Sequence, residues 1–197
     1  MRIVGGHLRG RALVPPSGPA TRPTSDRVRE SMFNILAHAI PDFTFEGAHV
    51  LDLFAGTGAL GIEALSRGAA FCLFVEEDAG ARGTIRQNVE AFGLTGVTKI
   101  FRRDATSLGP ASGRAGAGLV FLDPPYDQGL AAKALQSAAA GGWIAGGAVI
   151  VIEDRKGAET ALPGGFTRID QRQWGDTQAV FARFGGAGAI VPGAPAR

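Results

Sequence analysis

The segment HVLDLFAGTGALG, residues 49–61, constrains the fold of this chain more than any other stretch. It begins with an apolar run of β-branched and aromatic residues, which predicts a short buried strand. Two glycines, Gly56 and Gly58, end that run, and apolar residues at helical spacing follow. A strand, a glycine turn and a helix leave helix N–H groups facing the end of a sheet. The segment therefore predicts a hollow of nucleotide size at that edge.

The glycine pattern by itself is weak evidence. Gly56, Gly58 and Gly61 spell GxGxxG, but a plain strand–helix turn that binds nothing can contain the same pattern. Asp52 makes the segment more informative, since it places a carboxylate within the apolar run. Burying a carboxylate is costly unless a partner stabilises its charge. We therefore expect either protein donors or a ligand beside Asp52.

Length and composition are those of an ordinary globular chain. With 197 residues, 45% of them hydrophobic and 19% charged, the chain is long enough for one domain with a substantial core. The single cysteine, Cys72, lies in an apolar run and is interpreted as a buried hydrophobic residue. The three histidines are scattered and give no zinc pattern. We therefore expect neither a disulfide framework nor a bound metal.

The sequence carries no recognisable targeting or membrane segment. The N-terminus lacks the apolar core of a signal peptide. Residues 134–152 are uncharged, but two glycine pairs divide them, which favours a helix, a turn and a strand over a membrane span. We expect a cytoplasmic protein that does not enter a membrane.

Positive charge is concentrated near the N-terminus. The net charge is only +2, yet residues 1–40 contain six arginines and two acidic residues. A basic segment on a nearly neutral body indicates an anionic polymer as partner. An arginine-rich composition, with 17 Arg to 3 Lys, explains the same charge without a partner, so charge alone does not separate the two interpretations.

Strand and helix patterns alternate along the chain, which predicts an α/β fold with a mostly parallel, seven-stranded sheet and right-handed crossovers. We expect residues 1–23 to form a small β-hairpin and a loop, residues 24–184 the main domain, and residues 185–197 a disordered tail. After the first strand, the patterns predict strands at 71–75, 97–101, 119–122 and 148–152, helices starting at Thr24 or Ser25 and over 78–92 and 128–139, and a closing antiparallel pair at 166–172 and 178–184.

Two of these strands are followed by acidic residues. Glu76-Glu77-Asp78 come about 20 residues after the glycine turn, where nucleotide-binding folds hold a ribose diol. The next strand is followed by Arg102-Arg103-Asp104-Ala105. The carboxylates after the strand at 71–75 are therefore candidates for holding a ribose.

The sequence Asp123-Pro124-Pro125-Tyr126 follows the strand at 119–122. Two consecutive prolines stop strand pairing and stiffen the backbone. At the same sheet edge as the glycine turn, this segment offers a carboxylate, a rigid carbonyl and an aromatic face. These groups suit a planar base with an exocyclic amine, with Asp123 and the Pro124 carbonyl accepting its two N–H groups and Tyr126 stacking on the ring. A proline-stiffened turn without a ligand is the alternative.

Such a site would activate an amine that is otherwise a weak nucleophile. An amine conjugated to a purine is a poor nucleophile because its lone pair is delocalised into the ring. Two acceptors that hold its hydrogens favour a pyramidal nitrogen whose lone pair points outward. Held in line with an activated methyl group, that nitrogen reacts through orientation and preorganised electrostatics.

The motifs DLFAGTGALGIEAL, VEED, RRDA and DPPY, in this order and spacing, resemble class I S-adenosylmethionine-dependent methyltransferases that modify exocyclic amines. The upstream stretch RPTSDRVRESMFNIL narrows the resemblance to the RsmD family, which methylates guanine N2 in 16S ribosomal RNA. The resemblance covers roughly residues 1–184. WGDT at 174–177 is similar to the family's closing stretch, which often has tyrosine where Trp174 stands. The resemblance implies a Rossmann-like fold with helices on both faces of the sheet.

The resemblance also implies roles for individual residues. S-adenosylmethionine would be the methyl donor, and its product S-adenosylhomocysteine. Its binding residues would be Asp52, Phe54, Ala55, Gly56, Thr57, Gly58, Glu76, Glu77, Asp104 and Ala105. The target guanine would be held by Asp123, Pro124, Pro125 and Tyr126. Four residues, Arg22, Thr24, Asp26 and Arg27, would lie near the mouth of the pocket, where they would contact the cofactor, the RNA or only one another, as in a helix start that satisfies itself. Separately from the resemblance, the charge of the N-terminal hairpin predicts that Arg2, Arg9 and Arg11 contact RNA.

We predict a monomeric enzyme that draws a guanine out of ribosomal RNA within a small-subunit assembly particle and binds that RNA mostly through phosphates and shape. Three alternatives stay open. A DNA amine methylase would share DPPY, but no separate target-recognition domain is evident. A nicotinamide-dependent oxidoreductase would share GxGxxG, but has no use for DPPY. A non-catalytic RNA-binding protein would not need both the cofactor-side and the base-side residues.

Overall fold

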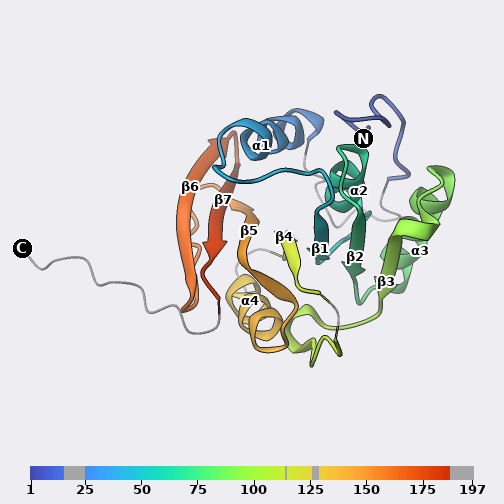
Figure 1. Ribbon diagram of the computed structural model, residues 1–197. Helices are drawn as coiled ribbons and strands as arrows, with labels where there is room; N and C mark the ends of the chain where they lie inside the picture. The colour runs from blue at the N-terminus through green and yellow to red at the C-terminus, as the bar shows by residue number, and fades with distance from the viewer. Residues whose placement is uncertain (16–24, 114, 126–128, 187–197) are drawn as a thin grey trace, which may run out of the picture.

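Seven strands form one sheet in the computed structural model, which describes residues 1–15, 25–113, 115–125 and 129–186. The strands are β1 His49–Leu53, β2 Phe71–Val75, β3 Thr98–Phe101, β4 Ala117–Leu122, β5 Ile144–Arg155, β6 Phe166–Trp174 and β7 Thr177–Phe184. Their order in the sheet is β3-β2-β1-β4-β5-β7-β6 (Figure 1). The predicted seven-stranded sheet is confirmed.

The first five strands run parallel, and β7 lies antiparallel between β5 and β6. The chain builds outward from β1 toward β3 and then crosses to β4, which pairs with the other side of β1. In such α/β sheets, ligands bind outside the carboxyl ends of the strands where the strand order reverses. The topology therefore directs a binding site to the carboxyl ends of β1 and β4.

Helices cover both faces of the sheet, as expected. They are α1 Asp26–His38, α2 Ala59–Ser66, α3 Ala79–Ala91 and α4 Leu130–Ala140, together with the 3₁₀ turns η1 Thr95–Val97 and η2 Ala105–Ser107. Buried residues of α1, α2 and α3 pack on one face, and those of α4 and η2 pack on the other. Figure 1 shows α1 and α2 above the sheet and α4 below it.

The helix starts follow the local sequence. Ser25 caps α1 by accepting a hydrogen bond from the Val28 amide, and Asp78 caps α3 in the same way at 2.7 Å from the Ala81 amide. Helical spacing in the sequence predicts that α1 buries Val28, Met32, Ile35, Leu36 and Ala39, and this prediction is partly wrong. Ala39 is exposed, whereas the charged residue Arg29 is completely buried. Arg29 faces the buried Glu63 of α2, and hydrophobic periodicity cannot predict such a contact between charged residues.

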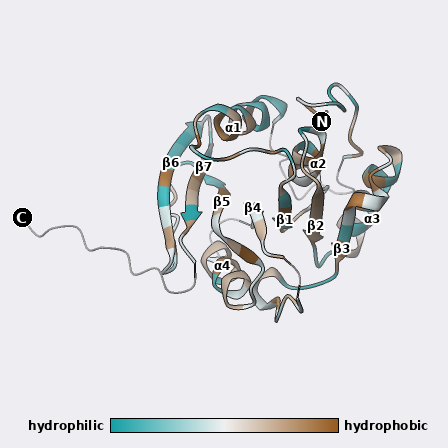
Figure 2. Ribbon diagram, viewed as in Figure 1, coloured by the Kyte–Doolittle hydropathy of each residue, from teal (hydrophilic) through white to brown (hydrophobic). Residues whose placement is uncertain are grey.

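Hydrophobic residues concentrate in the middle of the sheet. Figure 2 shows brown on β4 and long teal stretches on β6, the edge strand. A register shift between Arg168 and Asp170 adds one residue to β6 there. Polar side chains and an irregular register are devices that keep an edge strand from pairing with other chains. The strand predicted at 148–152 is longer than expected, since β5 begins at Ile144 and includes a glycine pair.

The N-terminal segment, residues 1–15, doubles back on itself as a short hairpin. Its strand pairing is reduced to one antiparallel bridge between Arg2 and Ala12, supported by hydrogen bonds such as Ile3 N–H to the Arg11 carbonyl at 3.0 Å. The predicted loop after it and most of the predicted tail fall on residues 16–24 and 187–197, outside the described part. Within the described residues, no helix has the length and apolar character needed to cross a bilayer.

Candidate active site

The glycine turn joins β1 to α2 at the predicted edge of the sheet. Gly56 and Gly58 both have positive φ angles, 55° and 77°, which glycine adopts without strain. Phe54 also has a positive φ of 61°, a conformation that is uncommon for a bulky residue and costs roughly 1–3 kcal/mol. Strain of this kind often marks a functional turn, and no sequence pattern signals it.

Gly61 lets α2 approach the sheet closely. A Cβ atom at this position would overlap the ring of Phe74 and the sulfur of Cys72, both on β2. The third glycine of the pattern thus serves helix–sheet packing. Cys72 is buried and free, as interpreted from the sequence, and burial raises the pKa of its thiol.

Asp52 lies at the end of β1 and is only 2% exposed. Its Oδ2 accepts the Gly61 amide at 3.0 Å, so the protein donor is an N–H group in the first turn of α2. Burial raises the pKa of Asp52 to about 8, opposed by the Gly61 hydrogen bond and reinforced by the negative charge of Glu76. The sequence predicts either a protein donor or a ligand beside Asp52, and the structure shows a protein donor, the Gly61 amide.

Glu76 connects the end of β2 to the glycine turn. One carboxylate oxygen accepts the Gly56 amide at 2.9 Å, and the other accepts the Asp78 amide at 2.8 Å. These two backbone donors fix the carboxylate beside the turn, 20 residues away in sequence. Its neighbour Glu77 is exposed.

Asp104 and Ala105 lie just beyond β3. The Oδ1 atom of Asp104 accepts hydrogen bonds from both the amide and the hydroxyl of Thr106, each at 2.7 Å, which caps η2 and orients the carboxylate. Ala105 is 4% exposed and packs into the core on the α4 side of the sheet.

The DPP segment follows β4 directly. Asp123 keeps some solvent contact, Pro124 is buried, and Pro125 is exposed. Surrounding protein raises the pKa of Asp123 well above its ordinary value, and the negative charge of Glu153 adds to this, followed by those of Asp52 and Asp154. The aromatic residue expected to stack on the base, Tyr126, lies outside the described residues.

Strand register brings the carboxylates to one face of the sheet. Asp52 pairs in register with Phe74 on β2 and with Phe121 on β4. Both phenylalanines pack in the core on the α1 side of the sheet, and residues paired in register share a side, so Asp52 lies on that side too. Because side chains alternate along a strand, positions two residues further on share that side. Those positions are Glu76 and Asp123. Asp52, Glu76 and Asp123 are therefore placed on one side of the sheet, at the ends of β1, β2 and β4.

Among the described residues, no group of three or more His, Cys, Asp or Glu side chains is arranged to hold a metal ion.

A family model described as Conserved hypothetical protein 95 matches residues 1–183. The chain belongs to this family, the RsmD family. A curated relative from Escherichia coli strain K12, named Ribosomal RNA small subunit methyltransferase D, is 39% identical over 163 residues, 83% of this chain and 78% of the relative. One of the same name from Haemophilus influenzae is 31% identical over 177 residues, 89% of each chain. The resemblance inferred from the motifs is confirmed.

A solved structure of the E. coli protein yhhF has the same fold. It superposes with a TM-score of 0.79 at 30% identity and covers 95% of this chain and 99% of that one. The Rossmann-like α/β fold is therefore confirmed for this RsmD family member.

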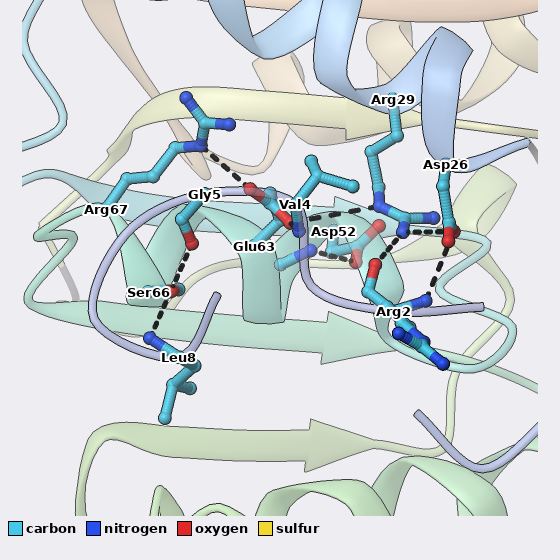
Figure 3. Close-up of polar contacts among 11 residues, drawn as sticks. Arg2, Val4, Gly5, Leu8, Asp26, Arg29, Asp52, Glu63, Ser66 and Arg67 are labelled. Atoms are coloured by element: carbon cyan, nitrogen blue, oxygen red, sulfur yellow. Dashed lines mark hydrogen bonds and ion pairs between the residues drawn. The ribbon is translucent and has the colours of Figure 1, made fainter. Parts of the chain in front are cut away.

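The N-terminal segment of this RsmD family member is docked on α1 and α2 by polar contacts (Figure 3). Glu63 on α2 accepts the Val4 amide at 2.8 Å, and Ser66 accepts the Leu8 amide at 2.9 Å while donating its hydroxyl to the Gly5 carbonyl at 2.6 Å. Periodicity predicted none of these contacts, because Glu63 and Ser66 occupy buried positions of a helix that otherwise reads as apolar.

The predicted RNA-contacting residues have different environments. Three of them, Arg2, Arg9 and Arg27, are exposed. Arg11 donates to the Ala91 carbonyl at 2.7 Å and lies over the Phe92 ring at 4.6 Å, so it also holds the segment to α3.

Asp26 takes part in the helix start. Its Oδ1 accepts the Arg2 amide at 3.1 Å and the Arg29 guanidinium at 2.8 Å. Although partial burial opposes them, these donors hold the pKa of Asp26 below its ordinary value. Two other predicted contacts, Arg22 and Thr24, lie outside the described residues.

Asn88 is a residue that the sequence did not single out. It is 1% exposed on α3. Its Nδ2 donates to the Thr57 carbonyl in the glycine turn at 3.0 Å, and its Oδ1 accepts the Val14 amide at 2.8 Å. The sequence signal that could have identified Asn88 is its place next to Val89, on the apolar side of α3. Asn88 links the glycine turn to the N-terminal segment.

Proposed function

We propose that this chain transfers a methyl group from S-adenosylmethionine to the N2 amine of a guanine in 16S ribosomal RNA. Its membership of the RsmD family and the curated relatives named Ribosomal RNA small subunit methyltransferase D support this function. The observation that carries it is the meeting of Asp52 and Asp123 at adjacent strand ends on one face of the sheet. Asp52 belongs to β1, which leads into the glycine turn, and Asp123 begins the DPP segment.

The residues around the glycine turn fit the cofactor. Glu76 is held beside Gly56 by a backbone hydrogen bond, at the position where Rossmann-like folds bind ribose hydroxyls. We assign the methionine part to Asp52 and to the turn of Phe54, Ala55, Gly56, Thr57 and Gly58, the ribose to Glu76 with Glu77 beside it, and the adenine to Asp104 and Ala105. The cofactor, when bound, supplies an activated methyl group on a positively charged sulfur.

The DPP segment would hold the target amine. Asp123 and the Pro124 carbonyl accept its two hydrogens, while Pro125 stiffens the backbone and Tyr126 stacks on the ring. This grip leaves the nitrogen lone pair directed at the methyl group. When the N–C bond forms, the nitrogen becomes positively charged and must lose a proton. A carboxylate with a raised pKa, such as Asp123, is suited to take it.

The N-terminal segment would contact RNA. Arg2, Arg9, Arg11 and Arg27 provide positive charge from exposed positions, and Arg22, Thr24 and Asp26 belong to the same stretch of sequence. Contacts of this kind bind phosphates and position the RNA without reading its sequence. We infer that residues 1–23 act as an RNA-contacting extension of the domain 24–184, and that the enzyme acts as a cytoplasmic monomer on a small-subunit assembly particle.

Methyl transfer tests the proposal directly. Small-subunit RNA lacking the modification is incubated with methyl-labelled S-adenosylmethionine and either the wild type or Asp123→Ala. We expect transfer by the wild type and a rate lower by about 100-fold or more in the variant, because one acceptor of the amine is lost. S-adenosylhomocysteine should bind both proteins, and NAD neither. Equal transfer rates would remove Asp123 from the mechanism.

A further inference from the structure

We propose that Glu153 makes the enzyme select guanine by accepting a hydrogen bond from the guanine N1–H group, next to the amine held by Asp123. This inference rests on the proposed function and adds a residue that determines which base is accepted.

The position of Glu153 follows from the register of β4 and β5. Phe121 pairs with Val151, and Leu122 pairs with Ile152. The next residues along the two strands are Asp123 and Glu153, so they occupy neighbouring positions at the same sheet edge. Val151 packs on the α1 side of the sheet, and alternation puts Glu153 on that side too.

Glu153 is 4% exposed, so its carboxylate lies within the protein at the end of β5. The electrostatics agree with this placement beside Asp123. Among nearby charges, that of Glu153 contributes most to the raised pKa of Asp123. The strand register and this charge effect both place the two carboxylates as neighbours at the sheet edge.

The base edge explains why a second carboxylate would matter. Guanine presents two adjacent donors on its Watson–Crick edge, N1–H and the N2 amine. Adenine and cytosine place an acceptor, N1 or N3, beside their amine. An ionised carboxylate accepts hydrogen bonds and donates none. Glu153 would therefore bind N1–H of guanine and repel the ring nitrogen of the other two bases.

Asp123 and the Pro124 carbonyl cannot make this choice. Both groups accept hydrogens from an amine, and all three bases carry one. Discrimination needs a group that contacts the neighbouring ring position. A site that hydrogen-bonds a substrate N–H rejects an analogue without it strongly, because a buried polar group is then left unpaired. Among the described residues near Asp123, Glu153 has the chemistry and the placement for this role.

A base analogue separates recognition of N1–H from recognition of the amine. 2-Aminopurine keeps the 2-amine of guanine but has an acceptor at N1. The nucleotide methylated by the wild type is first mapped by mass spectrometry. Small-subunit particles are then assembled from ligated RNA that carries guanine or 2-aminopurine at that position, and kcat/KM is measured for both.

The variant Glu153→Gln should change the preference between these bases. We expect the wild type to prefer guanine by at least about 100-fold. Since a glutamine amide can donate to an N1 acceptor, the preference should fall at least about tenfold in this variant. Glu153→Met, which removes the acceptor without adding a donor, should lower kcat/KM on guanine and reduce the preference as well. The preference is the ratio of kcat/KM on guanine to kcat/KM on 2-aminopurine. Because a smaller fraction of folded enzyme lowers both values equally, this ratio separates recognition from a loss of stability.

Asp154→Asn is the matched control, because it removes the negative charge next to Glu153 in the sequence. The Asp154 carboxylate accepts a hydrogen bond from the Thr160 hydroxyl at 3.1 Å. Its preference for guanine should equal that of the wild type. An unchanged preference in both Glu153 variants would overturn the inference and leave the proposed function standing. Absence of guanine methylation by the wild type would overturn both.

Discussion

The side chains of Arg29 and Glu63 are both completely buried and lie opposite each other, with 3.9 Å between Nε and Oε2. Arg67 also pairs with Glu63, at 2.8 Å, and the Arg29 guanidinium donates to the Arg2 carbonyl. Figure 3 shows how these groups join α1, α2 and the N-terminal segment. A buried ion pair of this kind adds little net stability over an apolar pair, but removing one partner takes away part of the compensation of the charge that stays buried.

Replacing Arg29 should therefore destabilise the fold strongly. We expect Arg29→Leu to lower the free energy of unfolding by about 2–4 kcal/mol, because the Arg2 carbonyl and Asp26 lose a donor and the buried Glu63 keeps Arg67 but loses its second cation. Arg27→Leu, at an exposed position on the same helix, should change it by less than about 0.5 kcal/mol. Urea unfolding measures both. Similar stability of the two variants would contradict a structural role for the buried pair.

Gly61 should not tolerate a side chain. A Cβ there meets the Phe74 ring and the Cys72 sulfur, so Gly61→Ala should cost about 1–3 kcal/mol through overpacking. Gly83 on α3 is a matched control, since open space surrounds its Cβ direction and alanine should stabilise the helix by about 0.5–1 kcal/mol. Thermal or urea unfolding of both variants should give opposite signs, and a stable Gly61→Ala would contradict close packing of α2.

Asn88 should support cofactor binding through the glycine turn. Asn88→Ala leaves the Thr57 carbonyl and the Val14 amide without this partner, which should cost about 1–3 kcal/mol of stability. We also expect affinity for S-adenosylhomocysteine to fall about tenfold, equivalent to about 1.4 kcal/mol. Calorimetry tests this, with the exposed neighbour Gln87→Ala as control. Unchanged affinity in Asn88→Ala would limit Asn88 to stabilising the N-terminal segment.

Asp52 should make stability depend on pH. Its pKa is about 8 in the folded chain against 3.8 for an ordinary aspartate. Between these values the unfolded chain has lost a proton that the folded chain keeps, so the free energy of unfolding falls as pH rises. Asp52→Asn removes this ionisation and keeps an acceptor for Gly61. Urea unfolding at pH 5 and pH 8 should show a smaller decline in the variant, whereas equal declines would exclude Asp52 as the cause.

Much of the fold could be predicted because its elements are strongly patterned. The apolar runs around Asp52 and before Asp123, each stopped by glycine or proline, predicted the parallel strands and their shared edge. The buried Arg29–Glu63 pair and the Asn88 link could not be predicted, because each joins residues that are distant in sequence. The hairpin was predicted from its turn residues, but its pairing is reduced because tertiary contacts with Glu63 and Ser66 take up its amides.

The identity of the methylated nucleoside tests the central claim most directly. Small-subunit particles from cells that lack this protein are incubated with the wild-type enzyme and methyl-labelled S-adenosylmethionine, and the RNA is digested to nucleosides and separated by chromatography with mass detection. The account predicts label in N2-methylguanosine. Label in N6-methyladenosine or N4-methylcytidine, or no label in the RNA, would contradict it.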